Sequence, residues 1–444
     1  MCWKNIVAGL IVFLLASQAR ALTIDELAQR LQRVETEHAA RITKLEQENE
    51  RLRAENEKLK AQVQDTQQQV ETTTASVEAV NQDVSSLSTG AEWAKKTSIG
   101  GYGELHYNNL SQEPGEIDNE SFREADFHRF VIFFDHEFTD RLRFMSEVEI
   151  EHVIASSDDA GEVELEQAYL EYDVLSGGHG MLDHAALRGG LFLIPVGILN
   201  ETHEPPTFYG VERNEVETVI IPATWWEGGF GGTLGFAQGF SVDLAVTTGL
   251  ELPGTGSSAF RIRSGRNKVS EASADDLAYT MRLKYTGLPG LEVAGSVQYQ
   301  SDMTQSQGDG TEDGWLYEGH TIWNYAVGPG KFTFKGLYAK WDIQGSVIGD
   351  AGGDDQEGWY VEPSYRLNPG ITLGWSNFGD LGFYTRYQHV DGFRDQDRFE
   401  QWEVGFNYWP HEDVVLKFDY RNNNNEVTDA RDYDGFDLGL GYQF

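Results

Sequence analysis

Charged side chains gather in one stretch of the chain, between about Gly197 and Trp225. They are Glu201, His203, Glu204, Glu212, Arg213, Glu215 and Glu217, and Pro205-Pro206 stiffens the backbone among them. A connection of this length usually has a function or is disordered. Charged side chains held in a narrow water-filled space determine which ions enter it. The alternative is a surface loop with ordinary solvated charges.

A second set of charged residues alternates with apolar residues elsewhere in the chain. Its members are Arg129, Arg143, Glu147, Glu149, Glu151, Arg282, Lys284, Arg386, Lys417, Asp419 and Arg421. Opposed rows of acidic and basic side chains would create a transverse field that orders polar solutes. Equally, these side chains could pair with one another and stiffen the wall that carries them.

The sequence lacks common signatures of hydrolytic catalysis. Hydrolysis by a nucleophile needs a base within hydrogen-bond reach. No G-x-S-x-G or H-E-x-x-H pattern occurs, and the histidines are scattered. The acidic stretches Gly308–Asp313 and Asp429–Asp437 lack the spacing and the terminal bidentate Glu of an EF-hand loop. We therefore expect no catalytic residues, no metal site and no cofactor.

The alternating charges lie on segments with a two-residue period, which is typical of β-strands with one apolar and one polar face. Examples are residues 142–151, 277–285, 291–299 and 414–421. The polar face of a soluble β-sandwich contacts outside water, whereas that of a membrane barrel faces the lumen. Periodicity alone does not distinguish these two arrangements.

The connections between the segments favour the barrel, because they alternate in length. Tight turns are expected at Thr139-Asp140, Gln238-Gly239, Leu288–Gly290, Gly328–Gly330 and Pro410–Asp413, and long loops at Asn109–Glu124, Glu251–Ala274, Ser301–Gly314, Ile343–Gln356 and Asn422–Tyr433. Short periplasmic turns and long extracellular loops alternate in this way in outer-membrane barrels. The segments predict an all-β transmembrane barrel of about 16 antiparallel strands. Asn368–Asp380 is longer than a periplasmic turn requires.

The end of the chain agrees with this architecture. The last strand has an apolar or aromatic residue at every second position and ends in an aromatic residue: Phe436, Leu438, Leu440, Tyr442 and Phe444. Outer-membrane barrels commonly end in this way.

An α-helical coiled coil is expected ahead of the barrel. One set of residues recurs at every seventh position: Ile42, Asn49, Asn56, Val63, Val70, Val77 and Val84. A second set recurs three positions after the first: Leu45, Leu52, Leu59, Thr66, Thr73, Val80 and Leu87. This a/d pattern predicts self-association. Asn49 and Asn56 favour a dimer and the valines tolerate a trimer, so the number of helices stays open. Gly90 is expected to end the helix.

The first residues have the features of an export signal. Lys4 precedes the apolar run Ile6–Ala16, and Ala19-Arg20-Ala21 provides a cleavage site. The alternative, a membrane anchor, needs about 20 apolar residues. The expected domains are a signal peptide (1–21), a periplasmic coiled coil (22–90) and a barrel (91–444). Cys2, the single cysteine, lies in the segment to be removed, so no disulfide is expected.

The net charge of −38 argues against nucleic-acid binding, because acidic surfaces repel phosphates. An acidic excess fits solvated loops or a lumen that attracts cations.

Four runs of residues resemble the phosphate-selective porin O/P family. They are GGYGELHY (100–107), GGLFLIPVG (189–197), NETHEPPTFY (200–209) and PATWWEGG (222–229). The resemblance covers most of Ser98–Phe444 and is most specific around Gly189–Gly229. It implies a homotrimer of 16-stranded barrels, each with a loop folded into its pore. It does not extend to phosphate, since no Lys/Arg-dense strand is present.

These patterns together predict a Gram-negative outer-membrane porin for passive diffusion of small hydrophilic solutes or ions. The connection after the fifth strand would form the constriction. The expected partners are outer-membrane lipid and lipopolysaccharide, with peptidoglycan or a periplasmic protein as candidates for the coiled coil. Two alternatives stay open, an outer-membrane barrel enzyme and a trimeric tether or adhesin. Adhesins of that kind place few strands per chain after the stalk.

Overall fold

The computed structural model describes residues 24–112, 122–153, 161–178, 180–305, 311–373, 376–393, 397–424 and 433–444. The expected signal peptide and part of each acidic loop, Gly308–Asp313 and Asp429–Asp437, lie outside these residues. Two compact units make up the chain, residues 1–91 and 92–444. None of the helices in the described ranges is long and apolar enough to cross a bilayer.

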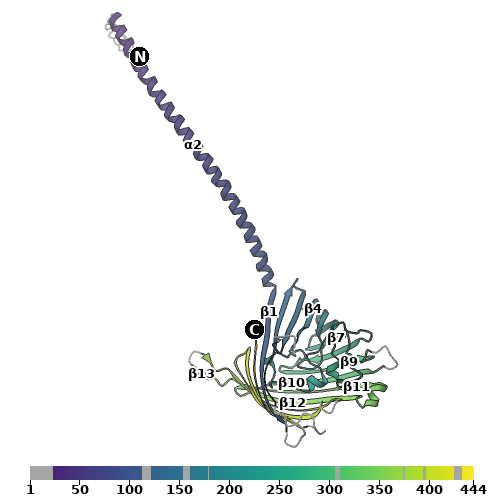
Figure 1. Cartoon of the computed structure of the whole chain (residues 1–444). Helices are drawn as coiled ribbons and strands as arrows, with labels where there is room; N and C mark the ends of the chain where they lie inside the picture. The colour runs from purple at the N-terminus through teal and green to yellow at the C-terminus, as the bar shows by residue number, and fades with distance from the viewer. Residues whose placement is uncertain are drawn as a thin grey trace, which may run out of the picture. The chain divides into compact units, whose positions relative to one another are not determined.

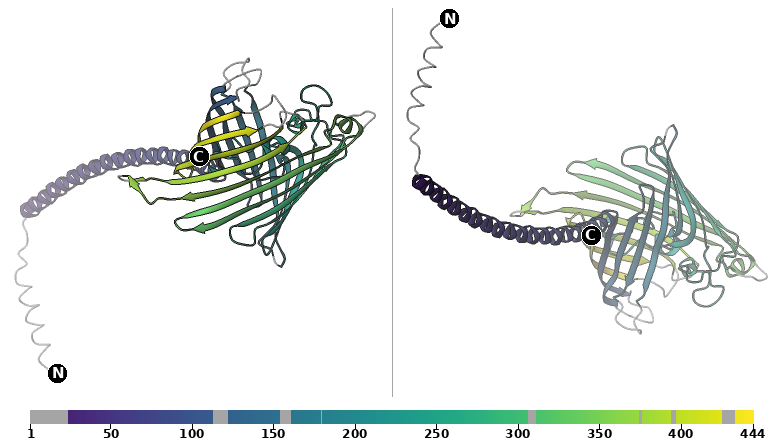
Figure 2. Two further views of the ribbon diagram at one scale, coloured as in Figure 1. Left: turned by 90° about the horizontal axis from the view of Figure 1, so that it is seen from below. Right: turned by 90° about the horizontal axis from the view of Figure 1, so that it is seen from above.

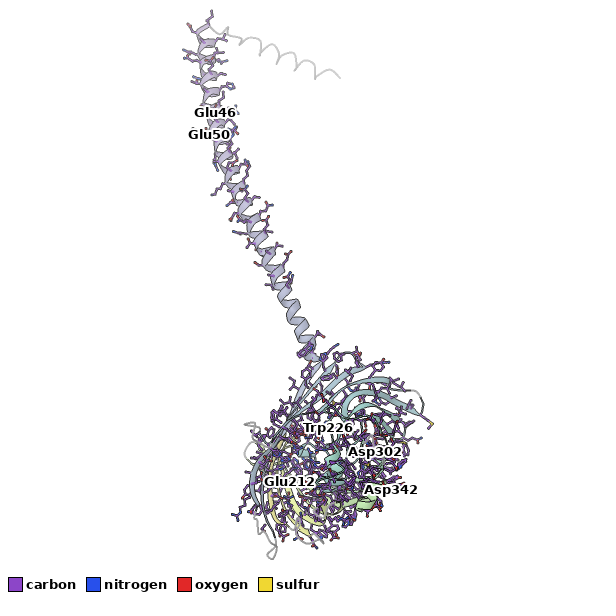
Figure 3. The ribbon with its side chains drawn as sticks, turned by 45° about the vertical axis from the view of Figure 1, so that its right-hand side comes forward. Glu46, Glu50, Glu212, Trp226, Asp302 and Asp342 are labelled. Atoms are coloured by element: carbon purple, nitrogen blue, oxygen red, sulfur yellow. The ribbon has the colours of Figure 1, made fainter. Side chains whose placement is uncertain are left out.

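The N-terminal unit is helical, as the heptad pattern predicts. Helix α2 (Ile24–Lys95) begins with Asp25 and Glu26 in its first turn, where carboxylates complement the helix dipole. Its side chains at residues 24–82 are exposed to solvent, Glu46 and Glu50 among them (Figure 3). The expectation that Gly90 ends the helix is wrong, because α2 continues to Lys95. A single glycine costs a helix only about 1 kcal/mol and does not stop it.

The apolar seam of α2 has no partner within the chain's own described residues. Its members are 51–61% exposed: Ile42, Leu45, Leu52, Leu59, Val63, Val70, Val77 and Val80. Val84 and Leu87 fall outside the residues whose side chains are described. Self-association of the helix stays a prediction.

The second unit is a closed antiparallel barrel, which confirms the predicted fold class (Figure 1). Within the described ranges it has sixteen strands. They are β1 (Thr97–Gln112), β2 (Phe122–Glu137), β3 (Leu142–Glu151), β4 (Val163–Ser176), β5 (Leu182–Leu193), β6 (Trp226–Phe236), β7 (Phe240–Thr247), β8 (Ala278–Tyr285), β9 (Leu291–Gln300), β10 (Asp313–Val327), β11 (Gly330–Gln344), β12 (Asp355–Leu367), β15 (Asp380–Asp391), β16 (Arg398–His411), β17 (Val414–Asn424) and β18 (Tyr433–Gln443). The last strand pairs with the first, so the yellow β18 lies beside the blue β1 in Figure 2.

The connections alternate in length as predicted. Each expected tight turn falls between consecutive strands of the described sheet. At Gln238 and Gly239 both φ angles are positive, at 77° and 84°, as the tightest hairpin turns require. The longer connection at Asn368–Asp380 contains a small extra hairpin, β13 (Thr372–Leu373) paired with β14 (Ser376–Asn377).

The longer loops carry short helical turns. These are η2 (Pro205–Thr207), η3 (Val216–Ile220), η4 (Ile262–Gly265) and α3 (Ser346–Ala351). The first two belong to the connection between β5 and β6, and the third to the connection between β7 and β8.

The two faces of the barrel wall have opposite character. On β16, Trp402 and Val404 are 57% and 56% exposed, whereas Glu403 between them is 4% exposed. Gln388 and Asp437 are likewise buried on the polar face of their strands. A soluble protein buries its apolar face, so this wall has the reverse pattern, which fits a lipid-facing exterior.

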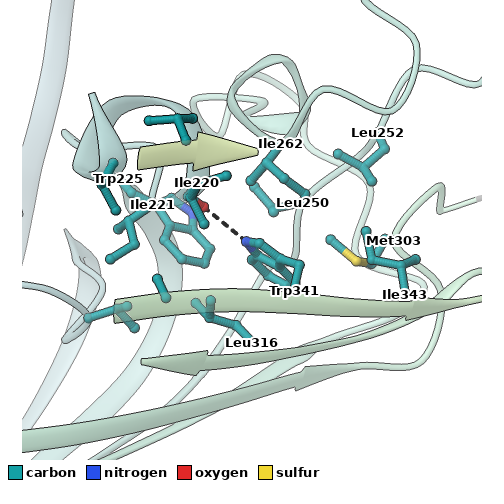
Figure 4. Close-up of a cluster of buried hydrophobic side chains, with 14 of the residues drawn as sticks. Ile220, Ile221, Trp225, Leu250, Leu252, Ile262, Met303, Leu316, Trp341 and Ile343 are labelled. Atoms are coloured by element: carbon teal, nitrogen blue, oxygen red, sulfur yellow. Dashed lines mark hydrogen bonds between the residues drawn. The ribbon is translucent and has the colours of Figure 1, made fainter. Parts of the chain in front are cut away.

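An apolar cluster joins the β5–β6 connection to the polar-face side of the strands (Figure 4). Trp225 and Ile220 of the connection pack with Trp341 of β11 and Leu316 of β10. The indole Nε1 of Trp341 donates a hydrogen bond to the Ile220 carbonyl oxygen at 2.9 Å. Each large apolar side chain buried in this way contributes about 1.5–3 kcal/mol. The connection is therefore packed as firmly as a protein core.

Candidate functional site

The connection Ile194–Trp225 follows the fifth strand, where the sequence places it, and its two ends are tied together. The side-chain amide of Asn200 donates to the carbonyl oxygens of Ile194 at 2.7 Å and of Trp225 at 3.0 Å. The Trp225 backbone N–H donates back to Asn200 Oδ1 at 2.6 Å. One asparagine thus closes the connection into a compact loop of the kind whose ends lie close together.

The buried Glu217 carboxylate organises the interior of this loop. It accepts hydrogen bonds from the backbone N–H groups of Ile198 at 2.6 Å and Leu199 at 2.7 Å. Asn214 donates to it at 2.9 Å and the Tyr360 hydroxyl at 2.8 Å. Glu217 is fully buried, so this predicted constriction residue holds backbone rather than contacting solvent.

The middle of the loop is held by side chains of distant strands. Three wall side chains of β15–β17 donate hydrogen bonds to backbone carbonyl oxygens of the loop: Arg386 to Tyr209 at 3.4 Å, Asn407 to Phe208 at 3.2 Å, and Lys417 to Gly210 at 2.8 Å. The Asp419 carboxylate accepts a hydrogen bond from the backbone N–H of Val211 at 2.7 Å. Gly210 has a φ of +88°, and a Cβ there would lie 2.7 Å from Glu403. The chain passes so close to the wall at this point that only glycine fits.

Several predicted wall residues form ion pairs with their neighbours. Arg386 pairs with Glu362 at 3.0 Å and with Glu403 at 2.5 Å. Arg282 pairs with Asp243 at 2.8 Å and also contacts Glu201 of the loop. In these positions the side chains neutralise one another, which is the stiffening role that the sequence left open.

A cavity of about 390 Å³ lies between the loop, the wall and the β7–β8 connection. Its charged and titratable lining residues are Glu104, His106, His128, Arg129, Glu212, Arg213, Glu215, Arg261, Arg263, Asp397 and Arg421. Five of these are arginines. Three of the five are paired: Arg129 with Glu104, Arg261 with Asp397, and Arg421 with Asp437.

The arginines without an acidic partner form a group of their own. Arg213, Arg263 and Arg266 pair with none of the carboxylates in the described ranges, and Arg213 Nε and Nη2 are buried without a hydrogen-bond acceptor. Arg263 Nη1 donates to the Ala223 carbonyl oxygen at 2.7 Å. Burial, together with the neighbouring Arg266 and Arg213, lowers the pKa of Arg263 to about 9. It is therefore positively charged at neutral pH.

Glu212, which is labelled in Figure 3, brings a negative charge to the same cavity. Its carboxylate lies 3.1 Å from His106 Nδ1 and accepts a hydrogen bond from Asn108 at 3.0 Å. Burial acts to raise the pKa of Glu212, but His106 outweighs burial and holds the pKa well below its ordinary value. Glu212 is therefore ionised and engaged by the β1 wall.

The structure brings five predicted residues to the cavity: Arg129, Glu212, Arg213, Glu215 and Arg421. The others lie elsewhere on the loop or the wall: Glu201, His203, Glu204, Glu217, Arg143, Glu147, Glu149, Glu151, Arg282, Lys284, Arg386, Lys417 and Asp419. Sequence reasoning missed Arg261, Arg263 and Arg266 of the β7–β8 connection. The signal was present, since RIRSGR (261–266) is an arginine-dense run in an acidic chain.

No family model matches the chain. A protein of Aquifex aeolicus (strain VF5), described as an uncharacterized protein, is 30% identical over 370 residues, which cover 79% of this chain and 80% of that protein. The chain belongs to the same family. The similarity between the two proteins extends over most of both chains and is not confined to a local motif.

A solved porin structure shares the fold of this barrel. The anion-selective porin from Comamonas acidovorans has a TM-score of 0.51 at 11% identity, covering 78% of this chain and 99% of that chain. Salmonella typhi OmpF in complex with daunomycin has a TM-score of 0.49 at 13% identity, covering 78% and 97%. These comparisons do not confirm the specific resemblance to the phosphate-selective porin O/P family.

Proposed function

We propose that the chain is an outer-membrane porin through which small hydrophilic solutes or ions diffuse passively. The observation that carries the proposal is the charged cavity of about 390 Å³ between the β5–β6 loop and the barrel wall. A charged, polar space beside a firmly packed loop is what a size-limited, water-filled channel needs.

The character of the barrel surface supports the membrane location. Apolar side chains such as Phe230, Trp402 and Val404 are exposed on the outer face, and charged side chains are buried on the other. Exposed apolar surface on this scale is unfavourable in water but favourable against lipid. The helical N-terminal unit would then lie in the periplasm, where its seam would join the subunits of a homotrimer.

The contacts of the loop support an inward fold. The loop bonds to side chains of β1, β8, β12 and β15–β17, which are spread over the closed sheet well beyond its own strands β5 and β6. A segment on the outside of the barrel would reach only neighbouring strands. We therefore infer that the loop crosses the lumen and narrows it.

The unpaired arginines favour anions over cations. Five arginines and four carboxylates (Glu104, Glu212, Glu215 and Asp397) line the cavity. Arg213 and Arg263 form no ion pair with a carboxylate in the described ranges, whereas Glu104 and Asp397 are paired with Arg129 and Arg261. Charges farther away than about 8–10 Å are screened at physiological salt. The local surplus at the cavity therefore matters more than the net charge of −38.

Single-channel recording in a planar bilayer under a KCl gradient tests the proposal. We expect stepwise currents, and we expect the reversal potential to have the sign of an anion-selective channel. Arg213→Gln with Arg263→Gln should move the reversal potential toward cation preference. The control is Arg143→Gln, since Arg143 is 46% exposed, paired with Asp173, and not among the residues that line the cavity. Wild-type protein that is folded but silent would contradict a pore, and a cation-selective reversal potential would contradict the arginine assignment.

A further inference from the structure

A cluster of buried ligand-type side chains lies outside the cavity, where the loop meets β3 and β4. It consists of Glu147, Glu166 and His203, which are 0%, 0% and 3% exposed. One ligand atom from each residue lies within 4.8 Å of those from the other two. The three residues come from β3, β4 and the loop, so they meet only in the folded protein.

Several polar atoms at this cluster have no hydrogen-bond partner in the described ranges. They include Glu166 Oε2, His203 Nδ1 and the Tyr102 hydroxyl. The Tyr102 ring packs edge-on against the His203 ring, with 5.9 Å between centroids, and Tyr102 is fully buried. Native proteins leave few buried polar atoms unsatisfied, and the free Glu166 oxygen beside the other ligand-type atoms indicates a missing ion or water.

The charge balance favours an ion over water. Glu149, which is 1% exposed, lies beside Glu166 and brings a third buried carboxylate. Neither Glu147 nor Glu166 forms an ion pair with a lysine or arginine in the described ranges, and Arg129 is engaged by Glu149 at 3.4 Å and Glu104 at 2.7 Å. Uncompensated buried carboxylates are costly, and a divalent cation would offset two of them.

The surroundings orient the carboxylates as outer-shell groups do at metal sites. The Thr224 hydroxyl donates to Glu166 Oε1 at 2.7 Å, and Gln167 donates to Glu147 Oε2 at 2.6 Å. His203 Nε2 lies 3.4 Å from Glu147 Oε1. Two ligands of a tetrahedral zinc ion, each about 2.1 Å from the metal, are separated by about that distance.

We propose that Glu147, Glu166 and His203 bind one zinc-class divalent cation. A histidine with two carboxylates suits zinc better than calcium, which takes oxygen ligands alone. His203 lies near the start of the loop and Thr224 at its end, so the ion holds both ends against β3 and β4. The ion is structural and acts independently of any solute that passes the barrel.

Zinc binding to the full chain purified in detergent, after removal of metal with EDTA, tests this site. Isothermal titration calorimetry and analysis of bound metal should show that one zinc ion binds per chain at Glu147, Glu166 and His203. His203→Gln and Glu166→Gln should abolish that ion, and Thr224→Ala should weaken its binding about 10–100-fold, as loss of an outer-shell partner does. X-ray absorption at the zinc edge should show nitrogen and oxygen ligands with one imidazole.

The matched control is His152→Gln. His152 belongs to a more exposed cluster with Asp126 and His128, which contains the same kinds of ligand atom. This variant should keep the ion of the buried cluster. Zinc should also raise the thermal unfolding midpoint of wild type but not of His203→Gln, a readout that does not involve conduction. The proposal would be overturned if His203→Gln kept the zinc ion while His152→Gln lost it. It would also be overturned if folded wild-type protein bound no zinc.

Discussion

Charged residues of one loop have different tasks depending on what surrounds them. Glu217 is enclosed and receives four hydrogen bonds, while Arg213 faces the cavity with unpaired donors. Both residues look alike in a charged stretch of sequence. Burial and hydrogen-bond partners separate the residue that organises the loop, Glu217, from the residue that lines the cavity, Arg213.

Replacing Glu217 tests its structural role. Glu217→Ala leaves buried donors unpaired, and each costs about 1–3 kcal/mol. The variant should therefore unfold at a markedly lower temperature in detergent, as followed by circular dichroism. Glu204→Ala is the control, because Glu204 is a carboxylate of the same loop that is only half-buried. Equal effects of the two substitutions would argue against Glu217 as the centre of the loop.

The residue types of the site were predictable, but their pairing was not. The length and charge of the β5–β6 connection marked it as special before the structure was known. Its partners could not be inferred, because Asp419 lies 208 residues from Val211 in the chain. For the same reason Arg263 was missed, since only folding brings the β7–β8 connection to the cavity.

At the scale of elements, local periodicity determined what could be foreseen. A seven-residue period marks a long helix and a two-residue period marks strands, and both were predicted correctly. The hairpin β13–β14 was not predicted, because strands of two residues have no periodicity to detect. The helix continues past Gly90 to Lys95, because a single glycine lowers helix stability by only about 1 kcal/mol and is no stop signal by itself.

The exposed seam of α2 predicts how the helix associates. Leu52→Asp with Leu59→Asp places charges at d positions, where apolar side chains would meet those of another chain. The oligomer should dissociate at a lower temperature or detergent concentration, as measured by cross-linking. Glu46→Asp with Glu50→Asp is the control, since both residues keep their charge and lie off the seam. An oligomer unaffected by the leucine changes would show that the barrel alone holds the subunits together.

At the scale of the whole molecule, the barrel has apolar residues outside and charged residues on its other face. Leu244→Arg tests whether that outer face contacts lipid, because arginine near the bilayer midplane costs about 2–4 kcal/mol. Leu244 is exposed in the middle of β7. Leu288→Arg in the β8–β9 turn is the control, since near the interface the same change costs about 0–1 kcal/mol. Denaturant unfolding from lipid vesicles measures both, and equal losses would contradict a lipid-facing wall.

The central claim is that the β5–β6 loop lies in the conduction path, and blocking the channel at Arg213 tests it most directly. The single cysteine, Cys2, lies in the segment expected to be removed, so Arg213→Cys would provide a unique thiol. Adding a bulky thiol reagent during single-channel recording should reduce the current in discrete steps, with Leu244→Cys on the outer face as the control. An unchanged current, with modification of Arg213→Cys confirmed by mass spectrometry, would contradict the account.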